Sequence, residues 1–342
     1  KLGTGYTLRA TATGLTSATS TPFNIVAGAA TQLAFTTQPT NTTAGATMAT
    51  VRVTARDGQG NTATGFTGNV TVAIGTNPGG GSLTGTTTVA AVAGVATFSA
   101  LSIDKSGTGY TLTATASGLT GATSSTFNVS AAALSQIAFT VDPSNATAGA
   151  TITPAVKVAG QDAFGNTVTS FTGSVTVAIT PGSGTAGATL SGTTTVNAVS
   201  GVATFSTLSI DKAGLDYHLT ATSGALTSAA SAIFAITAGA ATHVSFDQQP
   251  TSTTVNTTII PAVTVSARDA FGNIVKTFTA NVSVAIGTNP GSGTLNGTTT
   301  VPAIAGVATF STLSITAAGT GYTLVASSGL LTTDTSIAFS IN

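Results

Sequence analysis

One ten-residue segment occurs three times in the chain and sets the period of the whole sequence. It begins at Gly94, Gly201 and Gly306, and each copy contains Gly-Val-Ala-Thr-Phe-Ser followed, one residue later, by Leu-Ser-Ile. The copies lie 107 and 105 residues apart, which is the length of a small domain. Repetition at this spacing predicts a tandem array of one domain-sized repeat.

The composition favours β-structure and limits the partners. Hydrophobic residues make up 42% of the chain, while charged residues make up 5%, against roughly 25% in an ordinary globular protein. Threonine and valine, which favour strands, are abundant. Because the net charge is zero and cysteine is absent, we expect no nucleic-acid partner and no disulfide framework. The apolar runs are too short to span a bilayer, so we expect no membrane insertion.

Alignment of the repeats predicts one incomplete repeat followed by three full ones. Residues 1–27 match the end of a repeat and are expected to form its last two strands, F and G. The full repeats are expected at residues 32–129, 136–236 and 243–342. Linkers of about six residues are too short for free tumbling, so we expect an elongated rod.

The segment 1–27 raises a question of its own. Two strands alone would expose Tyr6, Leu8, Phe23 and Ile25, and a lone hairpin is barely stable in water. Two explanations are open. Either the chain is a piece of a longer protein, or strands of another chain complete this repeat by strand donation.

Apolar residues alternate with polar ones in seven segments of the first full repeat, which predicts seven strands. They are expected at residues 32–37, 48–56, 69–75, 86–92, 95–103, 110–116 and 124–129, and are called A to G. In strand E the alternation changes phase between Phe98 and Leu101. We therefore expect a β-bulge near residues 99–100, and near 206–207 and 311–312 in the other copies.

A recurrent tyrosine carries the first resemblance to a known fold. Tyr110 lies two residues before Leu112, in a segment that resembles the E–F corner of immunoglobulin folds, where leucine here holds the place of a cysteine. Tyr6, Tyr217 and Tyr322 hold the same place in the other repeats. Cysteine and tryptophan are missing, so the repeats are not antibody-type domains.

A closer resemblance is to bacterial immunoglobulin-like (Big) repeats of the invasin/intimin type. The shared pattern is a valine-rich strand, Asp-x-x-Gly-Asn, a second valine strand and the Gly-Val-Ala-Thr-Phe run, as in residues 158–166 and 175–179. The resemblance implies all-β, tandem immunoglobulin-like Greek-key sandwiches of seven strands. It also implies a bacterial cell-surface or extracellular location.

The Asp-x-x-Gly-Asn segments permit two interpretations. Asp162-Ala-Phe-Gly-Asn166 and Asp269-Ala-Phe-Gly-Asn273 contain oxygen ligands that calcium prefers. The preferred interpretation is a turn, because Asp bonds its own backbone and Gly takes a positive φ. Similarly, Asp104 and Asp211 are expected to cap the E–F corner, since Thr316 replaces them in the third repeat.

No arrangement of residues predicts catalysis. His218 and His243 have no counterparts in the other repeats, and Lys157 and Lys276 lie at non-equivalent positions, which disfavours a Lys–Asn crosslink. We therefore expect no enzyme activity, no catalytic, cofactor-binding or metal-binding residues, and no cofactor. Phe164 and Phe271, at the tips of their turns, either contact a neighbouring repeat or chain, or fold back under their own repeat.

The weakly charged surface predicts association. A net charge near zero carries little repulsion, and strand edges offer unpaired backbone groups. Sequons permit glycans on such a surface, at Asn41, Asn69, Asn128, Asn145, Asn256, Asn281 and Asn296.

Two functions are compatible with these features. The first is an extracellular structural protein, a stalk, filament or surface-layer component that associates with itself or with neighbouring repeats. The alternative is the arm of a bacterial adhesin, or the accessory module of a secreted enzyme, that binds a glycan or a host or partner surface through a tip outside this segment.

Overall fold

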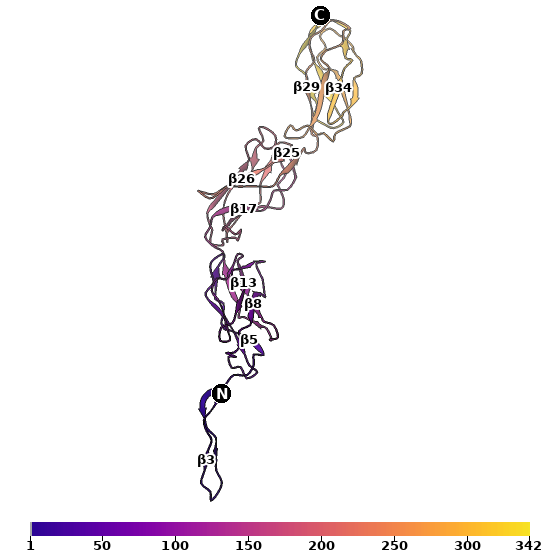
Figure 1. Cartoon of the computed structure of the whole chain (residues 1–342). Helices are drawn as coiled ribbons and strands as arrows, with labels where there is room; N and C mark the ends of the chain where they lie inside the picture. The colour runs from indigo at the N-terminus through magenta and orange to yellow at the C-terminus, as the bar shows by residue number, and fades with distance from the viewer. Residues whose placement is uncertain (1) are drawn as a thin grey trace. The chain divides into compact units, whose positions relative to one another are not determined.

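A computed structural model describes residues 2–342; Lys1, the first residue of the segment 1–27, lies outside the described residues. The described chain is all-β and contains no helix (Figure 1). It forms two compact units, Lys1–Gln136 with Gly160–Phe171, and Ile137–Ala159 with Thr172–Asn342. Among the described residues, none forms a helix with the length and hydropathy needed to cross a bilayer.

Two layers of strands form the first full repeat. One sheet has the order β11-β7-β5, and the other has the order β10-β8-β14-β15. The strands of these two sheets are β5 (Gln32–Thr37), β7 (Val51–Arg56), β8 (Asn69–Ile74), β10 (Thr88–Ala90), β11 (Val95–Phe98), β14 (Leu112–Thr115) and β15 (Ala122–Thr123). Short strands complete the repeat: β6 (Thr42–Thr43), β9 (Leu83–Thr84), β12 (Ser102–Ile103), β13 (Gly107–Tyr110) and β16 (Phe127–Ser130).

The second full repeat has the same order of strands. They are β17 (Gln136–Val141), β18 (Ala146–Thr147), β19 (Val156–Gln161), β20 (Ser174–Ile179), β21 (Leu190–Ser191), β22 (Thr195–Asn197), β23 (Val202–Phe205), β24 (Ser209–Ile210), β25 (Gly214–Tyr217), β26 (Leu219–Thr222), β27 (Ala229–Ala230) and β28 (Phe234–Thr237). Their sheets are β17-β19-β23 and β22-β20-β26-β27.

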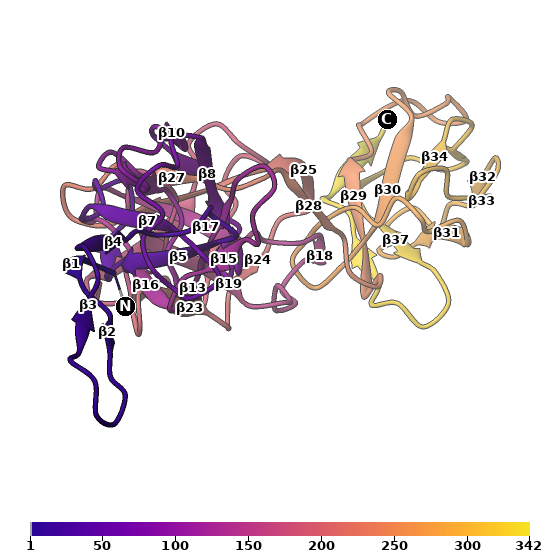
Figure 2. The same ribbon diagram turned by 60° about the horizontal axis from the view of Figure 1, so that its bottom comes forward.

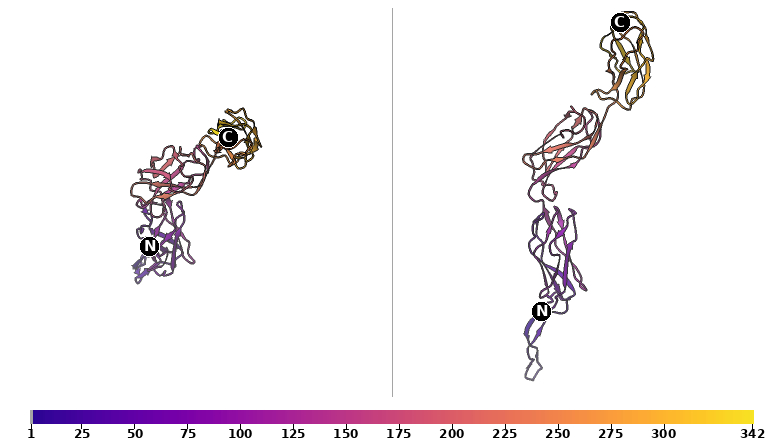
Figure 3. Two further views of the ribbon diagram at one scale, coloured as in Figure 1. Left: turned by 90° about the horizontal axis from the view of Figure 1, so that it is seen from above. Right: turned by 45° about the horizontal axis from the view of Figure 1, so that its top comes forward.

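The third full repeat again has the sheets β29-β30-β34 and β33-β31-β37-β38. Figure 2 shows β29 beside β30 and β31 beside β37, and the two layers of this repeat are visible in Figure 3. The strands are β29 (His243–Gln248), β30 (Val263–Arg268), β31 (Asn281–Ile286), β32 (Leu295–Asn296), β33 (Thr300–Pro302), β34 (Val307–Phe310), β35 (Ser314–Ile315), β36 (Gly319–Tyr322), β37 (Leu324–Ser327), β38 (Asp334–Thr335) and β39 (Phe339–Ile341).

The predicted bulge in strand E is a break instead. Strand β11 ends at Phe98, and the chain resumes as β12, which pairs with β9 rather than with β7. At the break the chain passes close to Gly85, whose φ is +98°, since a Cβ there would lie 1.9 Å from the Ala100 carbonyl oxygen. The break still turns Phe98, Leu101 and Ile103 into the core, as the change of phase predicts.

The tyrosine corner is confirmed in the three full repeats. Tyr110, Tyr217 and Tyr322 are fully buried. Each hydroxyl donates to a carbonyl oxygen five residues earlier in the chain, at 2.9, 2.8 and 2.9 Å. Together with the two-layer strand order, these corners make the repeats immunoglobulin-like sandwiches.

The segment before the first full repeat consists of two paired hairpin arms. Its strands are β1 (Gly3–Tyr6), β2 (Arg9–Ala10), β3 (Ala18–Thr19) and β4 (Phe23–Ile25), with β1 paired to β4 and β2 to β3. Tyr6 and Phe23 are 40% and 39% exposed, whereas their counterparts Tyr110 and Phe127 are buried. Both side chains are therefore more exposed than the residues at the equivalent places of the first full repeat.

Candidate functional site: the contact between repeats

The turn after strand B has the same construction in each full repeat, and we call it the B–C turn. It spans residues 57–61, 162–166 and 269–273. In the first copy, one Asp57 oxygen accepts the backbone N–H groups of Gln59 and Asn61 at 3.0 and 2.8 Å. Gly60 has a φ of +84°, which favours glycine at this place. The backbone of the Asp-x-x-Gly-Asn segment therefore forms the predicted turn.

The aspartate of the B–C turn also holds the linker that precedes its repeat. The second carboxylate oxygen accepts a linker N–H in every copy, at 3.0 Å from Gly28 to Asp57, 2.8 Å from Ala132 to Asp162 and 2.9 Å from Gly239 to Asp269. Protein donors thus occupy both oxygens. Among residues 2–342, no group of three or more His, Cys, Asp or Glu side chains is placed to hold a metal ion.

These hydrogen bonds stabilise the ionised carboxylates. The Asn61 side-chain amide, opposed by burial, lowers the pKa of Asp57 to about 2. Burial raises the pKa of Asp162 and Asp269, but the hydrogen bonds that each carboxylate accepts from its asparagine, its linker and its phenylalanine N–H together outweigh burial, so both pKa values are lowered.

The low pKa of Asp57 predicts acid sensitivity. Because the folded pKa of about 2 lies below the unfolded value of about 3.9, the ionised carboxylate contributes stability above about pH 4. That contribution is lost as the pH falls through about 2. We expect the unfolding free energy of the wild-type chain to fall over this window, measured by denaturant titration at fixed pH values. The fall in unfolding free energy over this pH window should be smaller in Asp57→Asn. An equal fall in both chains would contradict the assignment of a lowered pKa to Asp57.

The second B–C turn lies against the E–F corner of the first repeat. The Asn166 side-chain amide donates to the Asp104 carbonyl oxygen at 2.8 Å, and the Ser106 N–H donates to the Asn166 Oδ1 at 2.9 Å. The Lys105 ammonium donates to the Phe164 carbonyl oxygen. One asparagine therefore satisfies two backbone groups of the preceding repeat, and one lysine satisfies a carbonyl of the following turn.

The same set of bonds joins the third B–C turn to the E–F corner of the second repeat. Asn273 donates to the Asp211 carbonyl oxygen at 2.8 Å and accepts from the Ala213 N–H at 2.9 Å. The Lys212 ammonium donates to the Phe271 carbonyl oxygen at 2.8 Å. The repetition of three bonds with equivalent residues makes this contact a recurring feature of the chain.

Each phenylalanine ring covers a glycine of the preceding repeat. A Cβ at Gly45 would lie 2.2 Å from the Phe164 ring, and a Cβ at Gly149 would lie 2.2 Å from the Phe271 ring. Both glycines have positive φ, +71° and +75°. The rings stay about two-fifths exposed, at 41% and 43%. Of the two sequence alternatives, contact with a neighbouring repeat is correct.

Sequence analysis missed the other half of this contact. Gly45 and Gly149 receive the rings, and Lys105 and Lys212 bind the turn, but neither pair was singled out. The available signal was that glycine and lysine occur together in the first two repeats and are both replaced in the third.

The corner residues and the two histidines that were considered from the sequence have structural contacts. Asp104, Asp211 and Thr316 each accept a backbone N–H from the loop after strand C, at 2.7, 2.7 and 2.9 Å, which confirms the corner cap. His218 Nδ1 lies 3.4 Å from the Ser231 carbonyl oxygen, and His243 Nδ1 lies 3.0 Å from the Thr242 hydroxyl. Neither contact joins a histidine to an acid.

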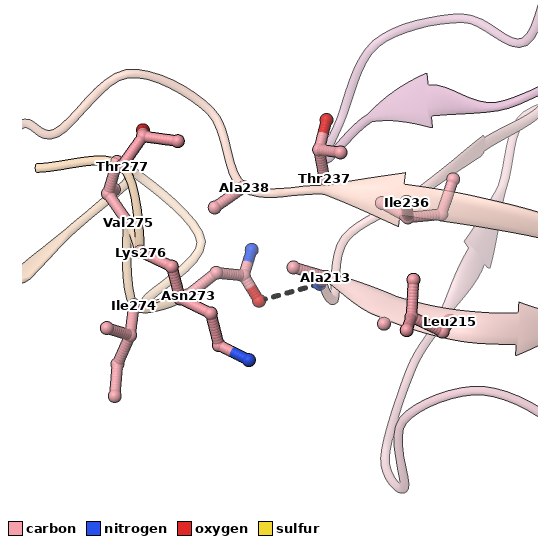
Figure 4. A pocket seen from close by; sticks show the side chains of 11 residues that line it. Ala213, Leu215, Ile236, Thr237, Ala238, Asn273, Ile274, Val275, Lys276 and Thr277 are labelled. Atoms are coloured by element: carbon pink, nitrogen blue, oxygen red, sulfur yellow. Dashed lines mark hydrogen bonds between the residues drawn. The ribbon is translucent and has the colours of Figure 1, made fainter. Parts of the chain in front are cut away.

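A cleft of about 540 Å³ opens beside the contact between the second and third repeats (Figure 4). Leu215 and Ile236 line it from the second repeat, and Ile274 and Lys276 line it from the third. Leu215 is 72% exposed. At the preceding contact, threonines hold the places of three of these residues, namely Thr108, Thr167 and Thr169.

No protein-family model matches the sequence, and no curated protein matches it. Among the solved structures that resemble the chain are an adhesin, an integrin-binding protein and a surface-layer protein. FdeC, described as an Escherichia coli adhesin, is 19% identical over 93% of this chain and 99% of that chain, with a TM-score of 0.36. Invasin, described as a bacterial integrin-binding protein, is 12% identical over 91% of this chain, with a TM-score of 0.30. Domains 4–9 of the surface-layer protein SbsC are 18% identical over 96% of this chain, with a TM-score of 0.26.

The chain spans 60% of the invasin structure and 52% of the SbsC structure. The assignment of an immunoglobulin-like array rests on the strand order, the repeated core motif and the tyrosine corners, and not on these likenesses.

Proposed function

We propose that the chain is an extracellular structural protein whose immunoglobulin-like repeats are coupled end to end as part of a stalk, filament or surface layer. The observation that carries the proposal is the contact between repeats, which uses equivalent asparagine, lysine and phenylalanine residues twice. A protein that only needed linked domains would not require this repeated set of bonds.

The pairing of the outer strands supports a load-bearing role. Strand β6 near the start of the first repeat runs parallel to β16 at its end, and β18 and β28 are paired in the same way. A pull along the chain acts on both paired strands along their length. The pulling force therefore acts on all the hydrogen bonds between the two strands at the same time, and not on one bond after another.

The near absence of charge supports self-association. Charged residues make up 5% of the chain and balance to a net charge of zero, so copies repel each other little. In this proposal the outer faces of the sandwiches contact other copies or neighbouring repeats.

Electron microscopy of the purified chain tests the structural function. Regular fibres or sheets are the expected result. Dispersed monomers at all concentrations and ionic strengths, together with binding to a glycan array, would contradict it and favour the adhesin arm.

One observation favours a second candidate function, ligand binding by an adhesin arm. The cleft beside Leu215 is bordered by two aliphatic side chains and a lysine that replace threonines of the preceding contact. Aliphatic groups beside a cation, of which Leu215 is exposed, suit an apolar ligand with a negative charge. The triple variant Leu215→Thr, Ile274→Thr and Lys276→Thr places the residues of the other contact in the cleft, so it should abolish any binding of an apolar, negatively charged ligand that the wild type has.

A further inference from the structure

One strand edge is open at the same place in each full repeat. Strands β10, β22 and β33 are each the end strand of a four-stranded sheet, so within the described chain one side of each strand has no neighbour in that sheet. We call this side the strand-D edge. An aliphatic side chain follows each of these strands and is largely exposed, with 77% at Val92, 74% at Val199 and 79% at Ile304. Exposed aliphatic groups therefore recur beside the same edge.

The hydrogen bonds of β10 show which backbone groups face the open side. The Thr87 carbonyl oxygen and the Ala91 N–H both bond β8 or the residue before it, at 2.8 and 3.0 Å. Backbone groups point to alternate sides along an antiparallel strand. The N–H and C=O groups of Thr88 and Ala90 therefore point away from β8, toward the open side.

Strand β22 of the second repeat has the same alternation. The Thr194 carbonyl oxygen and the Ala198 N–H bond β20 or the residue before it, at 2.9 and 3.0 Å, so Thr195 and Asn197 face the open side. A groove of about 450 Å³ runs beside this strand, and Asn197 and Val199 are among the residues that line it. This edge is accessible to a further strand.

The third repeat differs at one position of the edge. Pro302 holds the place of Ala90 and Asn197. Proline has no N–H group to donate, and proline or a charged side chain on an end strand is a common protection against pairing with another chain. Residues 86–92 and 193–199 contain neither proline nor a charged residue. The strand-D edge is therefore protected in the third repeat and unprotected in the first two.

The chemistry of the unprotected edge fits a second copy of the same edge. The side chains beside the open side of the first repeat are Thr86, Thr88, Ala90 and Val92, so two copies bring no like charges together. Thr88 and Ala90 each carry one donor and one acceptor toward the open side. An antiparallel pair of identical edges therefore places every donor opposite an acceptor.

We propose that the strand-D edges of the first and second repeats are interaction surfaces for the same edge of a second copy of the chain, paired antiparallel about a two-fold axis. In the first repeat, Val89 then faces Val89 of the second copy, and Thr88 and Ala90 exchange hydrogen bonds across the axis. A proline at position 90 would remove half of these bonds. The inference rests on the self-association proposed above and assigns it to a strand edge.

The double variant Ala90→Pro with Asn197→Pro tests the proposal in the full chain. It gives both unprotected edges the residue that the third repeat already carries, so the strands can keep their pairing within the repeat. Sedimentation velocity over a concentration series measures association. We expect the association constant to fall about tenfold or more, because half of the bonds at each paired edge are lost. The matched control, Ala90→Thr with Asn197→Thr, keeps both N–H groups and should associate like the wild type.

Equal association of the proline variant and the wild type would overturn the assignment to this edge and leave the proposed function standing. A wild-type chain that stays monomeric at every concentration would overturn both. The variant Pro302→Ala keeps the test decisive even where a proline variant unfolds, because it gives the third edge the N–H that its counterparts have. We expect this variant to associate more strongly than the wild type, and unchanged association would count against the proposal.

Discussion

Replacing Asp269 with alanine is expected to lower the unfolding free energy of the third repeat by about 3 kcal/mol, because buried N–H groups lose their acceptor. One Asp269 oxygen accepts from the Phe271 and Asn273 backbones, each at 2.9 Å, and the other accepts from Gly239 at 2.9 Å. The side chain is almost fully buried. Denaturant unfolding measures the change.

The matched control for this substitution is Asp247→Ala in the same repeat. Asp247 forms an ion pair with Arg268 at 2.5 Å, but both side chains are 28% exposed. Pairs with this exposure contribute about 1 kcal/mol or less. If the two variants lose equal stability, the B–C turn does not depend on its buried aspartate as argued.

Replacing Phe310 with alanine is expected to cost about 4 kcal/mol, because the cavity adds to the lost burial of the ring. Phe310 ends the recurring Gly-Val-Ala-Thr-Phe run and is fully buried in the core of the third repeat. It faces Val263 across the sheet, in the register of β34 on β30. Calorimetry should show the transition of the third repeat moving to a lower temperature while the transitions of the other repeats stay unchanged.

Thr309→Ala is the control for the core substitution. Thr309 is the neighbouring residue of the same strand and is exposed. Its replacement should change the unfolding free energy by no more than about 0.5 kcal/mol. A loss at Thr309 as large as that at Phe310 would contradict the assignment of the two faces of β34.

The core of each repeat could be predicted from sequence because its signal is local. Val51, Val53 and Ala55 alternate with polar residues, and all three are fully buried. The tyrosine corner was predictable for the same reason, since Tyr110 bonds a carbonyl only five residues away. Patterns of this kind need no knowledge of where distant segments lie.

The contact between repeats could not be predicted because it joins residues far apart in the sequence. Asn166 and Asp104 are 62 residues apart, and the ring of Phe164 covers Gly45, which has no side chain to suggest a contact. The β-bulge predicted in strand E was wrong for a related reason. At its break the chain passes close to Gly85, the residue after β9, and this approach leaves no mark in the alternation of strand E.

The central claim is that the second and third B–C turns bind the E–F corner of the preceding repeat through Asn166 and Asn273. Hydrogen exchange of the side-chain amides of Asn61, Asn166 and Asn273, measured by NMR on the wild-type chain, tests it in one sample. We predict that Asn166 and Asn273 exchange about tenfold more slowly than Asn61, because both of their amide protons are bonded. Equal exchange at all three asparagines would contradict the account.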